Sequence, residues 1–195
     1  MRLGPAPLIP VDTPAHPVDD VDVRIRPETP ADHDAVRDVH LIAFAEADGR
    51  PDDEREAVEA GLTDRLREGP WYLPELSLVA EEGGRVVGHV ICTRADVGGE
   101  RALGLGPIGV LPDAQNAGIG SALVNAAVAV ARDRDERLIG LLGDPNFYGR
   151  FGFVDSRTVG VEAPDPMWGV HFQVLALDGD APRGTFHYAT PFDEL

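Results

Sequence analysis

The amino-acid sequence predicts one mixed α/β domain, in which helices flank a central β-sheet. Stretches with apolar residues at every second position alternate with stretches at helical spacing. A chain of 195 residues is long enough for one domain with a core and short for two, and the sequence holds no repeat or second hydrophobic nucleus. We expect this domain to span residues 21–195. Residues 1–20 hold five prolines, so we expect them to form an extended, disordered arm.

The first part of the domain is expected to hold a strand and two helices. Apolar and polar residues alternate over 21–25, as in a half-buried strand. Thr29 is a typical N-cap residue and Pro30 suits the first helical position, so we expect a helix from there to about Phe44. A second helix is expected over roughly 53–67, where apolar side chains form one stripe.

The middle of the chain predicts a β-hairpin, a further strand and a buried helix. Two β-branched runs within residues 76–97 flank Gly83-Gly84, a pair that tolerates the positive φ angles of a tight hairpin turn. A strand that carries glycines and Pro107 follows over 101–112 and ends at Pro112. The helix expected from about Gly118 to Arg132 is apolar on nearly every side, which predicts burial on more than one face.

Four more strands complete the predicted sheet. Residues 137–143 form a short continuous apolar run, typical of a central strand that is covered on both faces. The remaining strands are expected near 158–162, 171–177 and 185–188.

Composition excludes several classes of function. The chain has 17 basic and 34 acidic residues, a formal charge of −17, which argues against a surface that binds nucleic acid or anionic lipid. A cationic substrate is compatible with that charge, although a solvated acidic surface is the simpler explanation. No apolar segment approaches the roughly 20 residues that span a bilayer. The single Cys92 cannot form an internal disulfide and no Cys/His spacing resembles a metal site, so we expect a metal-free protein of the cytoplasm.

Two neighbouring glycine patterns compete as an anion-binding site. Residues 104–109 spell G-x-G-x-x-G, but an extended segment and Pro112 follow where a dinucleotide-binding turn requires a helix. Pro107 also removes an amide from that turn. Residues 115–120 spell Q-x-x-G-x-G directly before a long apolar helix. The first amides of that helix lack partners within it and lie at the positive end of its dipole, which favours an anion there.

The surroundings of the second pattern carry a family resemblance. The segment "LGPIGVLPDAQNAGIGSALV", with "LLGDPNFYGRFGF" after it, resembles the GNAT superfamily of acetyl-CoA-dependent N-acetyltransferases, and in particular a bacterial subgroup that shares the ending GDPxFYGRFGF. The resemblance runs from about Val21 to the C-terminus. It implies a single-domain GNAT fold, with a mixed, mostly antiparallel central sheet of about six to seven strands flanked by helices.

The resemblance also implies a set of cofactor-binding residues. In GNAT enzymes the main-chain amides of the matching loop hold the pyrophosphate of coenzyme A, and the preceding strand carries a bulge and pairs with the pantetheine arm. Asn146 is expected to hydrogen-bond the pantetheine amides, whereas Phe147, Phe151 and Phe153 are expected in the core. The implied cofactor contacts are Ile108, Val110, Gln115, Asn116, Ala117, Gly118, Ile119, Gly120, Ser121 and Asn146.

Tyr148 is the one catalytic residue that the resemblance implies. It matches a tyrosine that in many relatives lies near the cofactor sulfur and protonates the departing thiolate, a role in which a positioned donor contributes about 10²–10⁴ in rate. The alternative is a tyrosine that closes the site with its ring in the core. No general base is singled out: His89 has a suitable ordinary pKa but is more simply a packed histidine, and Glu75, Asp113 and Asp144 lie in loops near strand ends. Cys92, on a strand without a nearby histidine motif, is expected to be buried rather than nucleophilic.

The predicted function is direct transfer of an acetyl group from acetyl-CoA to a primary amine of a small molecule or peptide. The alternative is a GNAT-fold module that binds acyl-CoA as a sensor without turnover. A polyamine, an aminoglycoside, or a lysine or N-terminal amine fits the acidic composition equally well. Homodimers are common in the family, but the sequence leaves the oligomeric state open.

Overall fold

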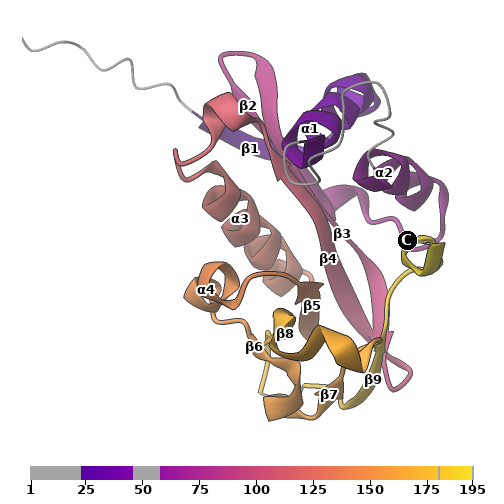
Figure 1. Cartoon of the computed structure of the whole chain (residues 1–195). Helices are drawn as coiled ribbons and strands as arrows, with labels where there is room; N and C mark the ends of the chain where they lie inside the picture. The colour runs from indigo at the N-terminus through magenta and orange to yellow at the C-terminus, as the bar shows by residue number, and fades with distance from the viewer. Residues whose placement is uncertain (1–22, 46–57, 180, 195) are drawn as a thin grey trace, which may run out of the picture.

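The computed structural model describes residues 23–45, 58–179 and 181–194 (Figure 1). The predicted N-terminal arm, the first two residues of the first predicted strand and the start of the second predicted helix lie outside these residues.

A single twisted sheet runs through the molecule (Figure 1). Seven strands follow one another across it, and β4 and β5 are the one parallel pair on this path. Two short strands, β9 (Gly184–His187) and β7 (Val161–Glu162), extend from the far end of β3, which brings the sheet to nine strands among the described residues. In spatial order, the seven are β1 (Val23–Pro27), β2 (Ser77–Glu82), β3 (Arg85–Val97), β4 (Glu100–Val110), β5 (Leu138–Leu142), β8 (Phe172–Ala176) and β6 (Val154–Asp155). This is the mixed, mostly antiparallel sheet that the family resemblance implied; its seven-strand path agrees with the six to seven strands expected, and β7 and β9 are additional.

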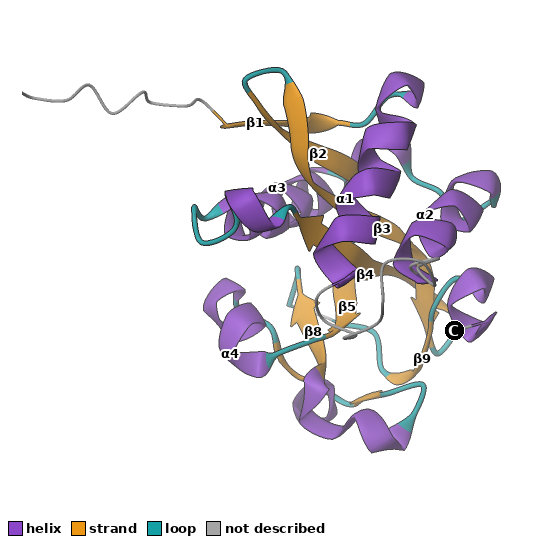
Figure 2. Ribbon diagram, turned by 45° about the horizontal axis from the view of Figure 1, so that its top comes forward, coloured by secondary structure: helices purple, strands orange, loops and turns teal. Residues whose placement is uncertain are grey.

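Helices cover both faces of the sheet (Figure 2). Helices α1 (His33–Ala45) and α2 (Val58–Glu68) lie together on one face, and α3 (Ile119–Asp133) lies on the other. The alternation of side chains along β3 explains this: a Cβ at Gly88 would contact Ile119 and Leu123 of α3, whereas the next residue, His89, contacts α1. Helix α3 buries six apolar side chains, in agreement with its predicted burial.

Two turns that the local sequence predicted are present, one after Thr29 and one at Gly83-Gly84. Thr29 precedes a 3-10 turn (Pro30–Asp32) that leads into α1, and both its amide and its hydroxyl donate to the Asp32 carboxylate at 2.8 Å. Gly83 and Gly84 have φ angles of +58° and +82°, as a tight hairpin turn requires.

Three elements of the second half were predicted wrongly or missed. The strand expected over 158–162 is reduced to β7, because the Asp155 carboxylate accepts from the Arg157 amide and starts a 3-10 turn (Ser156–Val159) instead. Strand β6 has two residues, too few for a periodic signal. Helix α4 (Pro145–Tyr148) was also missed, although Asp144 before Pro145 is a helix-start signal: the Asp144 carboxylate accepts from the Asn146 amide at 2.9 Å.

Candidate active site

The site begins where β4 and β5 separate. Their parallel pairing is limited to Leu103 with Ile139 and Gly104 with Gly140. Beyond Gly104, β4 bulges: three steps from Leu105 to Ile108 on this strand match two steps on β3. The predicted bulge is therefore present at Gly106 and Pro107. Among the described residues, the second half of β4 therefore has no strand neighbour on the β5 side.

A cavity of about 520 Å³ lies between this free half of β4 and the N-terminus of α3. Eight of the ten residues implied as cofactor contacts line it, and Ala117 and Asn146 do not. The lining residues are Ile108, Gly109, Val110, Ala114, Gln115, Asn116, Gly118, Ile119, Gly120, Ser121, Phe147 and Arg150.

Backbone geometry makes the loop before α3 a suitable anion site. Asn116 and Gly118 have φ angles of +61° and +84°, a combination that turns successive amides toward one side of the chain. The first hydrogen bond into the helix runs from the Ala122 amide to the Gly118 carbonyl at 2.9 Å. The amides of residues 119–121 precede it and have no partner in the helix ladder. An anion at such a helix end gains about 0.3–1 kcal/mol from the dipole alone.

Gln115 and Asn146 have partners within the protein. The Gln115 amide donates to the Pro112 carbonyl at 3.3 Å, and its side chain donates to the Val110 carbonyl at 3.0 Å. Gln115 therefore ties the loop to the end of β4. The Asn146 side-chain amide donates to the Asp144 carboxylate at 3.0 Å, which leaves its carbonyl oxygen for other contacts.

Arg150 is a cation at this cavity that the sequence reasoning missed. Its guanidinium lies over the Phe147 ring, 4.7 Å from the ring centre, and its Nε donates to the Phe147 carbonyl at 3.2 Å. It forms no ion pair within the described residues, so its charge is available to a bound anion. The sequence signal that could have revealed it is the position of Arg150 within "FYGRFGF", three residues after Phe147. Phe147, expected in the core, lines the cavity instead.

A second cavity, of about 690 Å³, meets the first at Ile108 and Phe147. It lies on the side of α1 and α2, and most of its lining is aromatic or aliphatic. The lining residues are Phe44, Glu59, Leu62, Leu105, Gly106, Pro107, Ile108, Leu142, Gly143, Asp144, Phe147, Tyr148, Trp168, Tyr188 and Phe192.

Two tyrosines, Tyr148 and Tyr188, line this second cavity. The Tyr148 ring occupies the space beside Gly143, and the Tyr188 ring occupies the space beside Gly104, where any larger residue would clash. Neither hydroxyl makes a hydrogen bond with another described residue. Burial, with a smaller effect from nearby Cys92, raises the pKa of Tyr148 to about 12, and burial raises the pKa of Tyr188 further. Both phenols are therefore protonated at neutral pH and can act as donors. Sequence reasoning missed Tyr188, because Tyr188 comes close to this site only when β9, the strand before it, pairs with β3.

His89 lies outside both cavities. It is fully buried, and its Nε2 lies 3.0 Å from the Ser77 hydroxyl while its Nδ1 lies 2.8 Å from Nε2 of His40. Burial lowers its pKa to about 3. It is thus a packed, neutral histidine, satisfied by side chains rather than by a backbone carbonyl, and it cannot contact a substrate directly.

The other titratable groups considered from the sequence are engaged in structure. Glu75 pairs with Arg134 at 3.2 Å and Asp113 pairs with Arg85 at 2.8 Å, while Asp144 caps α4. Burial raises the pKa of the Cys92 thiol to about 12, so it is not a nucleophile at neutral pH.

No group of three or more potential metal ligands is found among the residues that the structure describes. In the same part of the chain, no helix is both long and apolar enough to cross a bilayer.

Comparison with known proteins identifies the family. The model of the acetyltransferase (GNAT) family matches residues 36–153. The chain is 33% identical to the uncharacterized N-acetyltransferase YjhQ of Escherichia coli K12 over 114 residues, which are 56% of this chain and 63% of YjhQ, less than two thirds of that protein. It is 32% identical to the uncharacterized N-acetyltransferase YhbS of the same strain over 130 residues, 65% of this chain and 77% of YhbS.

Two solved structures resemble the whole fold. One is a GNAT family acetyltransferase from Brucella melitensis in complex with acetyl-CoA, with 34% identity, a TM-score of 0.72 and coverage of 89% of this chain and 99% of that one. The other is E. coli YhbS in complex with CoA, with 27% identity, a TM-score of 0.80 and coverage of 91% and 96%. From its sequence, its sheet and these matches, the chain belongs to the GNAT family of acetyltransferases.

Proposed function

We propose that this chain transfers an acetyl group from acetyl-CoA to a primary amine of a small molecule or peptide. The observation that carries the proposal is the meeting of two cavities at Ile108 and Phe147. The first cavity contains the N-terminus of α3, which favours an anion, and the second contains the phenol of Tyr148, which can donate a proton to a leaving group. The Brucella relative was solved with acetyl-CoA and YhbS with CoA, ligands that combine a diphosphate with an arm that ends in a thioester or a thiol.

In this proposal the first cavity holds the pyrophosphate and the pantetheine arm. The amides of residues 116–121, Ala117 included, surround the pyrophosphate, and Arg150 supplies the positive charge that the loop itself lacks. The backbone groups of Ile108 and Val110 on the free edge of β4 pair with the pantetheine amides, as an added strand would. Asn146 directly precedes Phe147, which lines the cavity. In this proposal its side-chain carbonyl oxygen accepts a hydrogen bond from the pantetheine arm.

The chemical step then takes place beside Tyr148. The neutral amine nitrogen attacks the thioester carbonyl carbon and forms the C–N bond. As the tetrahedral intermediate collapses, the C–S bond breaks and its electron pair leaves with the sulfur. The Tyr148 hydroxyl gives its proton to this thiolate and recovers one, through solvent, from the attacking nitrogen, which carries an extra proton after the C–N bond forms and loses it to give the neutral amide. The pKa of about 12 keeps Tyr148 protonated until that moment.

Turnover with a panel of primary amines tests the proposal. Purified protein is given acetyl-CoA and each amine, release of the free thiol is followed, and the acetylated amine is identified by mass spectrometry. Amide product with at least one amine supports the proposal. Tight coenzyme A binding without turnover on any amine would instead favour the non-catalytic sensor.

Three finer points belong to the same proposal: residues 21–195 form the acetyltransferase domain, the protein is a homodimer, and it acts in the cytoplasm. Limited proteolysis tests the first and sedimentation equilibrium tests the second. Cell fractionation tests the third.

A further inference from the structure

We infer that Tyr188 is a second catalytic residue: its hydroxyl donates a hydrogen bond to the carbonyl oxygen of the acetyl group and stabilises the oxyanion that forms there when the amine attacks. This inference rests on the proposed function, which supplies the thioester. It divides the work between the two phenols of the second cavity, Tyr148 for the sulfur and Tyr188 for the oxygen.

The Tyr188 ring stands at the point where β4 and β5 separate. Gly104 and Gly140 are partners in the second of the two pairs that join these strands. A Cβ at Gly104 would lie 2.6 Å from the Tyr188 ring, and a Cβ at Gly140 would lie 2.4 Å from the Phe186 ring, so both positions require glycine. The two aromatic rings therefore rest directly on the backbone where the strands divide.

Neighbouring rings hold Tyr188 in one orientation. The ring centres of Phe186 and Phe192 each lie 4.7 Å from that of Tyr188, and those of Trp168 and Phe172 each lie 6.3 Å away. A ring that is packed on several sides keeps its hydroxyl in a fixed place. Donors fixed in this way contribute most to a transition state, because nothing has to reorganise when the charge develops.

The Tyr188 hydroxyl faces the second cavity. It makes no hydrogen bond with another described residue, and it is not among the enclosed polar atoms that lack a partner, so it opens onto the cavity that Tyr188 lines. Burial, with a smaller effect from nearby Tyr148, raises the pKa of Tyr188 far above that of a free tyrosine. The hydroxyl therefore keeps its proton and remains a hydrogen-bond donor.

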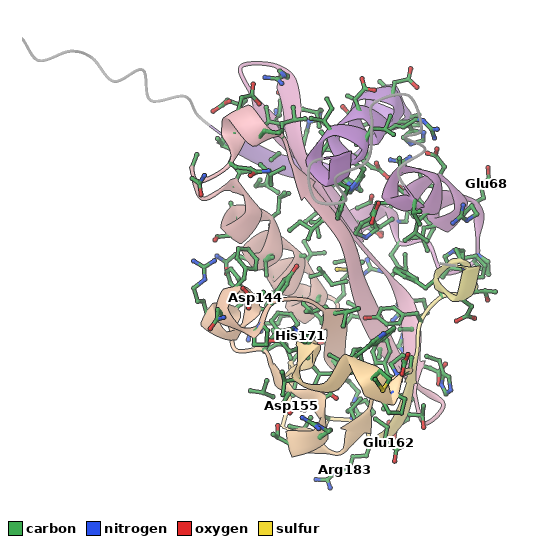
Figure 3. All side chains as sticks on the ribbon, in the orientation of Figure 1. Glu68, Asp144, Asp155, Glu162, His171 and Arg183 are labelled. Carbon is green, nitrogen blue, oxygen red and sulfur yellow. The ribbon has the colours of Figure 1, made fainter. Side chains whose placement is uncertain are left out.

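The wall beneath Tyr148 is equally well fixed. The Gly143 amide donates to the His171 carbonyl at 2.9 Å, and the Gln173 side chain donates to the Gly143 carbonyl at 3.1 Å. Figure 3 shows Asp144, the next residue, close to His171 at this end of the sheet. Since the Tyr148 ring fills the space beside Gly143, both phenols are held by the two strands that separate here.

The proposed path of the pantetheine arm leads to this point. The arm begins at the loop before α3 and runs along Val110 and Ile108, which is the direction toward Gly104 on β4. Its sulfur then arrives between the walls at Gly104 and Gly143. Sulfur and oxygen are bonded to the same carbon in a thioester, so a sulfur beside Tyr148 brings the oxygen to the neighbouring phenol.

The hydrogen bond acts on the charge of the intermediate. When the neutral amine forms the C–N bond, the carbonyl oxygen gains a negative charge, which is costly in a cavity of mostly apolar lining. The Tyr188 O–H bonds this oxyanion more strongly than the uncharged carbonyl, and so lowers the barrier. No proton passes from Tyr188. The C=O bond re-forms as the C–S bond breaks, and Tyr148 alone gives a proton to the thiolate.

Binding of two ligands tests the contact without turnover. S-ethyl-CoA has a methylene group where acetyl-CoA has its carbonyl, and calorimetric titration gives both Kd values. We expect the parent chain to bind acetyl-CoA about fivefold more tightly, as one hydrogen bond predicts. Tyr188→Phe should lose most of this preference, and Tyr148→Phe should keep it, because both ligands have the sulfur. A preference that survives in Tyr188→Phe, or that is lost in Trp168→Phe instead, would overturn the inference.

Turnover tests the catalytic part. We expect Tyr188→Phe to lower kcat about tenfold or more and to leave the Kd for coenzyme A unchanged, because coenzyme A has no acyl carbonyl. Tyr72→Phe is the control for loss of a phenol: the Tyr72 hydroxyl donates to Glu28 at 2.9 Å, outside both cavities, and kcat should not change. Circular dichroism shows that each variant is folded. A kcat for Tyr188→Phe within about twofold of that for Tyr72→Phe would refute the role.

The two experiments together separate this inference from the proposed function. Turnover by the parent chain, with the acetyl preference intact in Tyr188→Phe, refutes the inference alone. Absence of turnover on every amine, with an acetyl preference that depends on Tyr188, refutes the proposed function and supports the carbonyl contact.

Discussion

Nε2 of His40 on α1 lies 2.8 Å from Nδ1 of His89 on β3, and both imidazoles are completely buried. The surrounding hydrogen bonds fix their tautomers. Because the Ser77 hydroxyl donates its proton to Glu28 at 2.7 Å, it must accept from Nε2–H of His89. His89 Nδ1 must then accept from His40, which leaves Nδ1 of His40 unprotonated and without a partner among the described residues. His89 therefore cannot become protonated without losing the hydrogen bond from His40, and protonation of His40 at Nδ1 would bury a charge that has no partner among the described residues.

This pair predicts loss of stability in mild acid. Burial lowers the pKa of His89 to about 3 and that of His40 well below its ordinary value, whereas both are near 6.5 when unfolded. Between pH 6.5 and about 3 the unfolded state binds more protons, so the free energy of unfolding falls as the pH falls, by up to about 1.4 kcal/mol per pH unit for each histidine. Urea unfolding between pH 7.5 and 5 checks this, above the range where most carboxylates titrate. His89→Asn should flatten the slope, and His187→Gln, an exposed histidine, should not.

Tyr148→Phe is expected to lower kcat about a hundredfold and to leave the Kd for coenzyme A nearly unchanged. The substitution removes the proposed proton donor but keeps the ring that packs beside Gly143. Tyr188→Phe is the matched comparison, because it removes the other phenol of the same cavity. Stopped-flow turnover and calorimetric binding of both variants check the prediction. If kcat falls by the same small factor in both variants, Tyr148 is not the proton donor.

Gly120→Glu is expected to weaken coenzyme A binding at least tenfold more than Gly120→Gln. Gly120 lies in the first turn of α3, where an added Cβ would meet Phe147 and Val110 only at 3.7 and 3.8 Å, so both variants should fold. They differ in one negative charge at the proposed diphosphate site. Calorimetric titration of both variants measures the difference. Equal affinities would place the diphosphate elsewhere.

Arg150→Gln is expected to raise the Kd for coenzyme A about fivefold to tenfold. The guanidinium is exposed at the first cavity and lacks an acidic partner there, so its loss removes attraction to the phosphates. The affinity of the variant should also depend less on salt than that of the parent chain. Arg24→Gln, on the distant strand β1, should change neither. An Arg150→Gln affinity within twofold of the parent would remove Arg150 from the site.

Local sequence signals predicted the parts of the site that are contiguous in the chain. The loop before α3 was indicated by its glycines and the start of a helix within 115–121, whereas the bulge of β4 was implied by the family resemblance, with which Pro107 and Gly109 agree. The hairpin turn at Gly83-Gly84 was predictable for the same reason.

The parts that were missed depend on contacts between distant residues. Forty-nine residues separate His40 from His89, so no local pattern reveals their hydrogen bond. Glu59 and Tyr188 reach one cavity from α2 and from the segment after β9, and only the tertiary fold brings them together. Arg150 lies within the recognised motif, but that it has no acidic partner among the described residues is visible only in the structure.

Tyr188 also bears on how much of the C-terminal segment the fold can lose. Its ring fills the space beside Gly104 and packs against Phe172 and Phe186. The loop before α3 and Tyr148 precede Tyr188 by 40 residues or more, so a chain truncated before Tyr188 keeps both of them. Such a truncated chain would expose apolar ring surface to water, which favours aggregation.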